Sequence, residues 1–234
     1  MKTMALKTSI QCHKDACRRN LSKYTIRALR MLPRIEAPTI LDIGCGSGVP
    51  TLELSRQCDG EVIGVDIDRF LLDLLERKIR RAGLSDRVRA VECSMFELGF
   101  PDESFDIIWA EGSISVIGFE RGIREWRRFI KPGGYLVVFD QSRGLSERLR
   151  HITSSGYDLI DHFEVKGEAF LEDYYVPLQK RIDNLRIEFR EDTQAQLALE
   201  KEQSEIDMVK RDPSKFSSTF FIIRKKTCAR EGGV

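Results

Sequence analysis

The hydrophobic pattern along the chain alternates between short apolar runs, which predict buried strands, and longer segments in which apolar residues recur at helical spacing. Seven strands are predicted in this way, at residues 39–43, 61–65, 87–92, 105–110, 135–139, 157–165 and 216–225. Helices are predicted between most of them, from residue 51 onward and at about 69–82, 120–130 and 145–154. Strands that alternate with helices form a parallel sheet covered on both faces.

Two helical segments lie outside this alternation. Leu21, Leu29 and Leu32 recur at helical spacing before Pro33 ends the first segment, because proline cannot continue a helix. After Gly167 and as far as Pro213, the chain is rich in Glu, Lys, Gln, Leu and Arg. This composition predicts two helices inserted between the last two strands. An insertion at the end of an α/β sheet is well placed to act as a lid.

Length and composition exclude several classes of protein. The chain has 234 residues, of which 41% are hydrophobic and 32% charged, so it can bury a core and is not a disordered chain. Its 38 Lys and Arg against 37 Asp and Glu do not suit a wholly basic nucleic-acid binder. No apolar run approaches the roughly 18 residues of a membrane span, and no apolar signal core follows Lys2. A soluble cytoplasmic protein is expected.

The six cysteines are too few and too scattered for a disulfide framework. Cys12, His13 and Cys17 form a C-H-x3-C arrangement that invites a metal interpretation. Zinc sites normally show a second pair of ligands downstream, and Cys45, Cys58, Cys93 and Cys228 supply none. We therefore expect reduced thiols and no metal.

The charge is balanced overall but not along the chain. Residues 1–35 hold nine Lys or Arg against the single acid Asp15, whereas residues 191–211 hold six acids and three bases. A basic end could grip an anionic substrate, a membrane surface or a partner subunit. Alternatively, these charges only form the solvated faces of helices.

The most informative segment is the glycine-rich stretch at residues 41–48, LDIGCGSG. Glycines between a strand and a helix let the backbone approach a ligand closely. The spacing is G-x-G-x-G, and Val49 stands where a dinucleotide-binding loop has its third glycine. Asp42 just before the loop would repel a pyrophosphate but suits a ligand with an amino group or another positive centre. After the second strand, Asp66 could accept two hydrogen bonds from a ribose diol, or it could be an ordinary turn residue.

These segments resemble class I S-adenosylmethionine-dependent methyltransferases, and in particular the branch with quinone-biosynthesis and small-molecule methyltransferases. Four motifs occur in the family's order, namely LDIGCGSG at 41–48, GVDI at 64–67, FPDESFDII at 100–108 and KPGGYL at 131–136. The resemblance covers about residues 38–142. It implies a Rossmann-like, doubly wound, seven-stranded, mostly parallel sheet with an antiparallel last strand. It also implies S-adenosylmethionine as the cofactor.

The resemblance also implies roles for individual residues. Gly44 and Gly46, in the loop that ends at Gly48, would line the methionine part of the cofactor, with Asp42 near its amino group. Asp66 would hold the ribose hydroxyls. Three residues would contact adenine, namely Ile67, Ser94 and Met95. Ser94 departs from the family pattern, in which an Asp usually accepts from the adenine amino group.

Glu111, at the end of the fourth strand, is the acid expected to face cofactor and substrate. It could orient the methionine amino group or act as a general base, and a solvated loop position is the alternative. Tyr174 and Tyr175 could shape an apolar substrate pocket, although core packing explains at least one of them better. Three histidines are weaker candidates for a base, at His13, His151 and His162.

We therefore predict one methyltransferase domain over residues 1–234. Its parts are an N-terminal helical cap (1–37), a cofactor-binding core (38–142), a helical insertion or lid (168–212) and a last strand (213–227). The expected reaction is methyl transfer to a small-molecule acceptor by in-line displacement. RNA and protein methyltransferases, a nicotinamide-dependent oxidoreductase and a non-catalytic cofactor-binding protein are the alternatives. The acceptor is not predicted, and the oligomeric state is open, a homodimer being one option.

Overall fold

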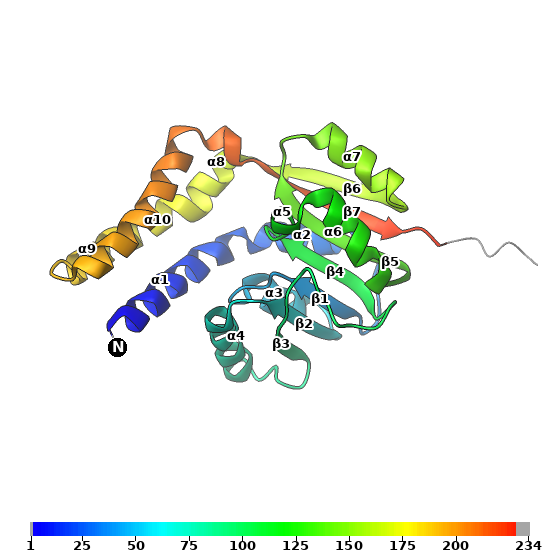
Figure 1. The fold of residues 1–234 in the computed structure, drawn as a ribbon, viewed down its shortest axis with the longest axis horizontal. Coiled ribbons are helices and arrows are strands. Elements are labelled where there is room, and N and C mark those ends of the chain that lie inside the picture. The colour runs from blue at the N-terminus through cyan, green and yellow to red at the C-terminus, as the bar shows by residue number, and fades with distance from the viewer. Residues whose placement is uncertain (1, 228–234) are drawn as a thin grey trace, which may run out of the picture. The chain divides into compact units, whose positions relative to one another are not determined.

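The computed structural model describes residues 2–227, which form two compact units (Figure 1). The sheet unit comprises residues 26–140, 144–163 and 219–227, and the helical unit comprises residues 2–25, 141–143 and 164–218. The expectation of a single domain stays a prediction, because compact units of contact do not by themselves define parts that fold independently.

The sheet unit is built on seven strands in the order β3-β2-β1-β4-β5-β7-β6. Their bounds are β1 Thr39–Ile43, β2 Glu61–Asp66, β3 Val88–Glu92, β4 Phe105–Glu111, β5 Ile130–Gln141, β6 Tyr157–Val165 and β7 Ser218–Lys225. The pairs β1–β2, β1–β4, β2–β3 and β4–β5 are parallel, and the last strand is antiparallel. The predicted Rossmann-like sheet is confirmed.

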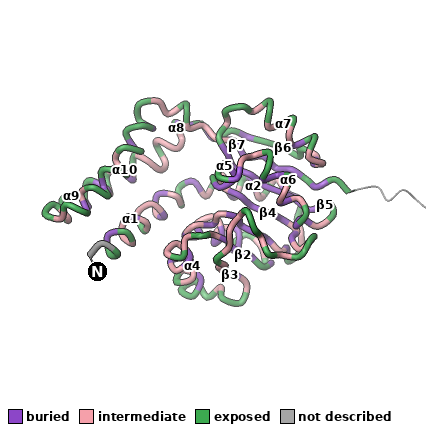
Figure 2. The backbone as a smooth tube through the Cα atoms, in the orientation of Figure 1, coloured by how far each residue is buried: buried purple, intermediate pink, exposed green. Residues whose placement is uncertain are grey.

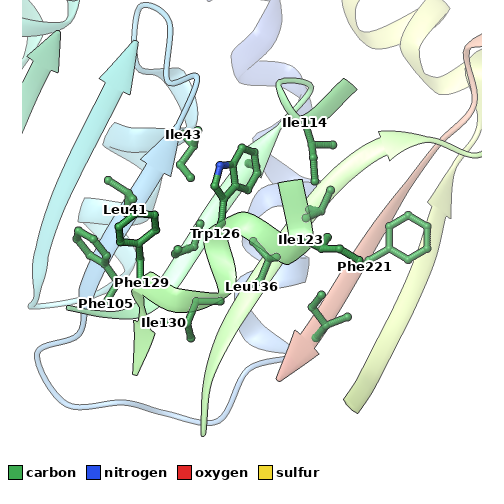
Figure 3. Packing of buried hydrophobic residues seen from close by; sticks show 14 of the residues in the cluster. Leu41, Ile43, Phe105, Ile114, Ile123, Trp126, Phe129, Ile130, Leu136 and Phe221 are labelled. Atoms are coloured by element: carbon green, nitrogen blue, oxygen red, sulfur yellow. The ribbon is translucent and has the colours of Figure 1, made fainter. Parts of the chain in front are cut away.

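One face of the sheet packs against helices that follow β4 and β5. Leu41 and Ile43 of β1, with Leu136 of β5, meet Ile123 and Trp126 of α6 (Phe119–Trp126) in one buried cluster (Figure 3). Ile152 of α7 (Leu145–Ser154) joins the same cluster. Because successive strand residues point to opposite faces, the neighbours Asp42 and Gly64 must lie on the other face.

The other face is covered by the helix that follows the glycine loop. Thr51 of α3 (Val49–Gln57) donates a hydrogen bond to Asp42. The methyl group of Thr51 would lie 3.3 Å from a Cβ added at Gly64. The next helix, α4 (Arg69–Arg81), begins at Arg69 as predicted, and the side chain of the preceding Asp68 accepts from the backbone N–H of Phe70. Figure 2 shows that burial in the sheet unit is concentrated along its strands.

A buried ion pair stands at the end of β5. The Asp140 side chain is 4% exposed and accepts two hydrogen bonds from Arg148 of α7, at 2.6 and 3.2 Å. The Arg148 guanidinium also lies 5.2 Å from the centre of the Phe119 ring. The pair therefore joins the end of β5 to α7 and to the start of α6.

The helical unit has an apolar core of its own. Its main helices are α1 (Lys2–Arg18), α9 (Val176–Glu188) and α10 (Thr193–Arg211), and α2 (Ser22–Arg30) continues from it into the sheet unit. Each main helix contributes three residues to one buried cluster, which consists of Leu6, Ile10, Cys17, Leu178, Ile182, Leu185, Ala195, Leu199 and Ile206. The two predicted inserted helices correspond to α9 and α10.

Several predicted bounds are wrong. The N-terminal helical segment, predicted within residues 1–37, starts at Lys2 and is divided into α1 and α2 by a 3-10 turn, Arg19–Leu21. The predicted helix at 120–130 ends at Trp126 and is followed by a 3-10 turn. A short helix α8 (Gly167–Phe170) and a π-helical turn (Leu171–Tyr175) precede α9, and a 3-10 turn (Pro213–Phe216) precedes the last strand.

Residues 131–134, which lie between the predicted helix at about 120–130 and the predicted strand at 135–139, belong to strand β5. The register explains this difference. Phe105 pairs with Ile130, but Ile107 already pairs with Tyr135, so the extra residues of β5 form a bulge. Gly133 has a φ of +73°, which glycine adopts without strain.

Candidate functional site

The glycine loop joins β1 to α3 and has left-handed backbone at Gly44, Gly46 and Gly48. The three positions differ in what surrounds them. A Cβ at Gly44 would collide with the Ser113 side chain, and a Cβ at Gly48 would collide with Leu75. At Gly46 an added Cβ would meet only Leu71 among the described residues, at 3.9 Å. The protein itself therefore leaves space beside Gly46, and a ligand that approaches the backbone can use it.

The Asp66 carboxylate links the glycine loop to the end of β2. Its Oδ2 accepts a hydrogen bond from the backbone N–H of Gly46 at 2.8 Å, and its Oδ1 accepts from the backbone N–H of Asp68 at 2.9 Å. An ionised carboxylate has about four acceptor positions. Two backbone donors fix its orientation, so the sequence-predicted partner of a ribose diol is held rigidly beside the loop.

The loop lies in a negative electrostatic environment. Asp42 is 1% exposed, and its Oδ2 accepts from the Thr51 hydroxyl at 2.6 Å. Burial, together with the negative charges of Asp42 and Asp66, raises the pKa of the Cys45 thiol far above its usual range. On the other side of the loop, Lys78 donates to the backbone oxygen of Ser47 at 2.7 Å. Two carboxylates beside the loop favour a ligand with a positive centre and disfavour a pyrophosphate.

The residues predicted to contact adenine surround the ends of β2 and β3. Ile67, directly after Asp66, is 73% exposed although it is a large apolar residue. The Ser94 hydroxyl accepts from the backbone N–H of Phe96 at 3.3 Å. The Met95 methyl would lie 3.7 Å from a Cβ at Gly44, and the backbone oxygen of Met95 accepts from the Trp126 indole at 3.2 Å. Met95 is thereby held beside the glycine loop, and Ile67 offers an open apolar surface.

Glu111 is the last residue of β4 and is half-buried. Its Oε1 accepts from the indole N–H of Trp109 at 2.8 Å. Ser113 follows after a turn at Gly112, and its hydroxyl donates to the backbone oxygen of Ile43 at 2.5 Å. The end of β4 is thus tied directly to the end of β1, and the predicted acid lies in the segment that borders the glycine loop.

The two tyrosines lie in the π-helical turn of the helical unit. Their rings are perpendicular, with centroids 4.8 Å apart, and both pack against the core of that unit. The Tyr175 hydroxyl donates to Glu205 at 2.9 Å. Burial raises the pKa of both phenols, that of Tyr175 more weakly. Packing within the helical unit accounts for both rings, so their proposed substrate contact needs a direct test.

The three histidines do not come together. His13 lies within 3.0 Å of Arg181 in the helical unit, and burial and that arginine lower its pKa. His151 lies near Glu120 and Glu147 on the surface of the sheet unit, and the exposed His162 stacks over Phe221. Within residues 2–227 no three His, Cys, Asp or Glu side chains are grouped to hold a metal ion. Cys228 lies outside the described residues.

The sequence predicted no hydrogen-bonding role for four residues at the site, namely Thr51, Lys78, Trp109 and Ser113. Their roles arise from hydrogen bonds to the loop or to its acids. The partners of Lys78 and Ser113 lie 31 and 70 residues away along the chain, so no local pattern indicates them. Of the four, only Trp109 has a role that the sequence could have indicated, because the N–H of a tryptophan in an apolar strand requires a hydrogen-bond acceptor.

The segment that holds this site matches a known protein family. Residues 40–134 match a family model described as "Methyltransferase domain". This segment of the chain is similar to methyltransferase domains. The match covers the glycine loop, Asp66 and Glu111, so the predicted family resemblance is confirmed for the segment that holds the site. None of the helices in the described part of the chain is long and apolar enough to cross a membrane.

Curated relatives match the chain over part of their own length. "Methyltransferase GfsG" of Streptomyces halstedii is 36% identical over 102 residues, which are 43% of this chain and 37% of the relative. "Demethylmenaquinone methyltransferase" of Symbiobacterium thermophilum is 32% identical over 155 residues, or 62% of this chain and 61% of the relative. The chain therefore spans less than two thirds of each relative that it matches here.

Solved structures share the fold of the chain. The "[4+2]-Cyclase SpnF" superposes with a TM-score of 0.74 and 21% identity, covering 88% of this chain and 80% of the other. A methyltransferase from Geobacter sulfurreducens, in complex with S-adenosylhomocysteine, gives a TM-score of 0.70 and 17% identity, covering 88% and 90%. At such identities these likenesses establish the fold alone, and one of the two proteins is a cyclase by name.

Proposed function

We propose that this protein is an S-adenosylmethionine-dependent methyltransferase that acts on a small-molecule acceptor by in-line displacement. The observation that carries the proposal is the space beside Gly46 in a loop bordered by the carboxylates of Asp42 and Asp66. A sulfonium ligand with an ammonium group and a ribose diol matches both the space and the charge. The curated relatives, which include sterol and menaquinone methyltransferases by name, support the small-molecule acceptor.

The described residues fit this cofactor. The loop from Gly44 to Gly48 would hold the methionine part, Asp66 the ribose hydroxyls, and Ile67 with Ser94 and Met95 the adenine. The bound cofactor supplies an activated methyl group. The chain itself has to orient the acceptor and exclude water, and positioning of this kind contributes on the order of 7 to 11 kcal/mol in favourable cases. Glu111 has two proposed roles, as a base where the acceptor loses a proton or as the partner of the methionine amino group.

Two binding measurements and one turnover measurement test the proposal. Calorimetry with S-adenosylhomocysteine and with NAD should show binding of the first and none of the second, because Val49 and the acids oppose a dinucleotide. The opposite result would establish the oxidoreductase alternative. Transfer of a labelled methyl group to candidate acceptors then separates an enzyme from a non-catalytic cofactor-binding protein. RNA and protein fractions belong in the same assay, since either as the preferred acceptor would contradict a small-molecule substrate.

Asp66 provides a prediction about the ribose. Asp66→Ala should weaken S-adenosylhomocysteine binding by about 2 kcal/mol, or roughly 30-fold, since hydrogen bonds to a charged group contribute about 1.5 to 3 kcal/mol. Part of this loss comes from the Gly46 N–H, which also loses its acceptor. A 2′-deoxy analogue separates the two effects. It should bind weakly to the parent, and the substitution should weaken it further only by the part that comes from the Gly46 N–H. Equal affinity of the parent for both forms would contradict the role of Asp66.

We also propose that the helical unit, which includes most of the predicted N-terminal cap (1–37) and helical insertion (168–212), shields the acceptor from water. Its separate apolar core supports this, because such a unit can respond to a ligand as a whole. Hydrogen exchange is the measurement. Cofactor with a true acceptor should slow exchange in both segments more than cofactor alone. Unchanged exchange in both, in a sample that transfers methyl groups, would contradict the shielding while leaving the enzyme activity intact.

A further inference from the structure

Trp109 and Glu111 form a hydrogen-bonded pair at the carboxyl end of β4. They are two residues apart in a strand and therefore lie on the same face of the sheet. Trp109 is fully buried, and its indole N–H donates to Glu111 Oε1 at 2.8 Å. A buried indole N–H without an acceptor is costly. The bond therefore satisfies the tryptophan and at the same time restricts where the carboxylate can be.

The surroundings of the indole keep it in one place. In the register of the sheet, Trp109 is opposite Asp42 of β1. The centroids of the Trp109 and Phe220 rings are 6.4 Å apart. The Phe220 ring stacks on that of Phe139, with centroids 4.2 Å apart. Phe139 is the register partner of Glu111 in the neighbouring strand. Aromatic packing of this kind fixes the donor, and the low local dielectric strengthens its bond to a carboxylate.

The three acids near the loop differ in their burial and in the groups that hold them. Asp42 is 1% exposed and accepts from Thr51. Asp66 accepts from two backbone N–H groups at the ribose end of the site. Glu111 is half-buried and stands at the edge of the sheet where β1 also ends. Among these three, Glu111 is the carboxylate best placed to meet a cationic group of a ligand in the loop.

We propose that Trp109 is a positioning residue, whose indole holds the Glu111 carboxylate in the orientation that accepts from the ammonium group of the cofactor's methionine part. This inference rests on the proposed function, and it makes Glu111 a binding group rather than a base. A carboxylate that is already fixed loses little conformational freedom when the ligand binds. Replacing either residue should therefore weaken ligands that carry the ammonium group and spare those that lack it.

A pair of ligands measures this difference directly. S-adenosylhomocysteine has the amino-acid end, and 5′-methylthioadenosine has the same nucleoside without it. Glu111→Gln keeps an acceptor oxygen for the indole but removes the charge. It should weaken S-adenosylhomocysteine about tenfold, which corresponds to about 1.4 kcal/mol, and leave 5′-methylthioadenosine within about twofold. Equal weakening of both ligands would overturn the inference, whereas no binding of either ligand to the parent would overturn the proposed function instead.

Trp109→Phe tests the positioning itself. It removes the N–H but keeps an aromatic ring, and it should weaken S-adenosylhomocysteine about threefold to tenfold with little change for 5′-methylthioadenosine. In the double variant with Glu111→Gln the two losses should not add, because both remove the same contact. Phe139→Leu is the matched control, since it disturbs the same aromatic cluster without removing the indole donor. Additive losses, or an equal selective loss in Phe139→Leu, would show that packing alone is responsible.

A spectroscopic signature completes the test in folded protein. The chain has two tryptophans, so an ¹⁵N-labelled sample gives two indole N–H signals, and Trp109→Phe identifies one of them. Glu111→Gln should shift the Trp109 signal. It should leave the Trp126 signal unchanged, because the Trp126 indole donates to the backbone oxygen of Met95 instead. S-adenosylhomocysteine should shift the Trp109 signal more than 5′-methylthioadenosine does. An unchanged Trp109 signal in Glu111→Gln would exclude the pair as the positioning device.

Discussion

Gly46→Val should remove measurable binding of S-adenosylmethionine and S-adenosylhomocysteine while leaving the protein folded. The added Cβ has only Leu71 within 4 Å among the described residues, so the side chain can be accommodated and will fill the space that we assign to the ligand. Overpacking of a complementary site costs about 1 to 3 kcal/mol. A branched side chain against the ligand should cost an amount at the upper end of this range, which lowers the affinity for the ligand roughly 100-fold or more.

Backbone strain has to be separated from this steric effect. Gly46 has a φ of +53°, and a residue with a Cβ in this region costs about 1 to 2 kcal/mol. Gly83, at the end of α4, has a φ of +66° and nothing within 4 Å of an added Cβ. Gly83→Val should therefore lower the free energy of unfolding by a similar amount and bind the cofactor normally. Retained binding by Gly46→Val would place the cofactor elsewhere.

The sheet and the glycine loop could be predicted because their signals are local. Apolar runs such as residues 39–43 and 61–65 become β1 and β2 almost without change, since a strand buried on both faces leaves a continuous apolar segment. The left-handed backbone at Gly44, Gly46 and Gly48 likewise follows from glycine itself. The start of α1 within the predicted N-terminal cap could not be located, because only a few residues, including Leu6, Ile10 and Cys17, mark its buried side.

The contacts that organise the site could not be predicted, because they join distant parts of the chain. Whether Asp42 faces a ligand or the interior depends on Thr51, which reaches it from α3. The bulge in β5 depends on its register with β4, so Pro132, Gly133 and Gly134 indicated a turn instead. The π-helical turn at Tyr174 and Tyr175 depends on packing within the helical unit. In each case the sequence identifies the residue, and the fold determines its partner.

The Asp140–Arg148 pair carries the largest predicted effect on stability. Arg148→Met keeps an apolar stem over Phe119 but leaves the Asp140 carboxylate, which is 4% exposed, without its guanidinium partner. Removing one member of a buried pair costs about 3 to 5 kcal/mol. The Arg148 side chain is 18% exposed, so we expect the lower end, about 3 kcal/mol. Urea unfolding followed by tryptophan fluorescence measures it, because both tryptophans lie in the sheet unit.

The double variant Asp140→Leu with Arg148→Met shows which interaction is responsible. Replacing both members of a buried pair by apolar residues is often neutral or stabilising, so the double variant should recover most of the stability that Arg148→Met loses. The recovery follows from the desolvation of Asp140, whose charge is costly only when it is unpaired. If the double variant is as unstable as Arg148→Met alone, the guanidinium stabilises the end of β5 through its contact with Phe119 and not through Asp140.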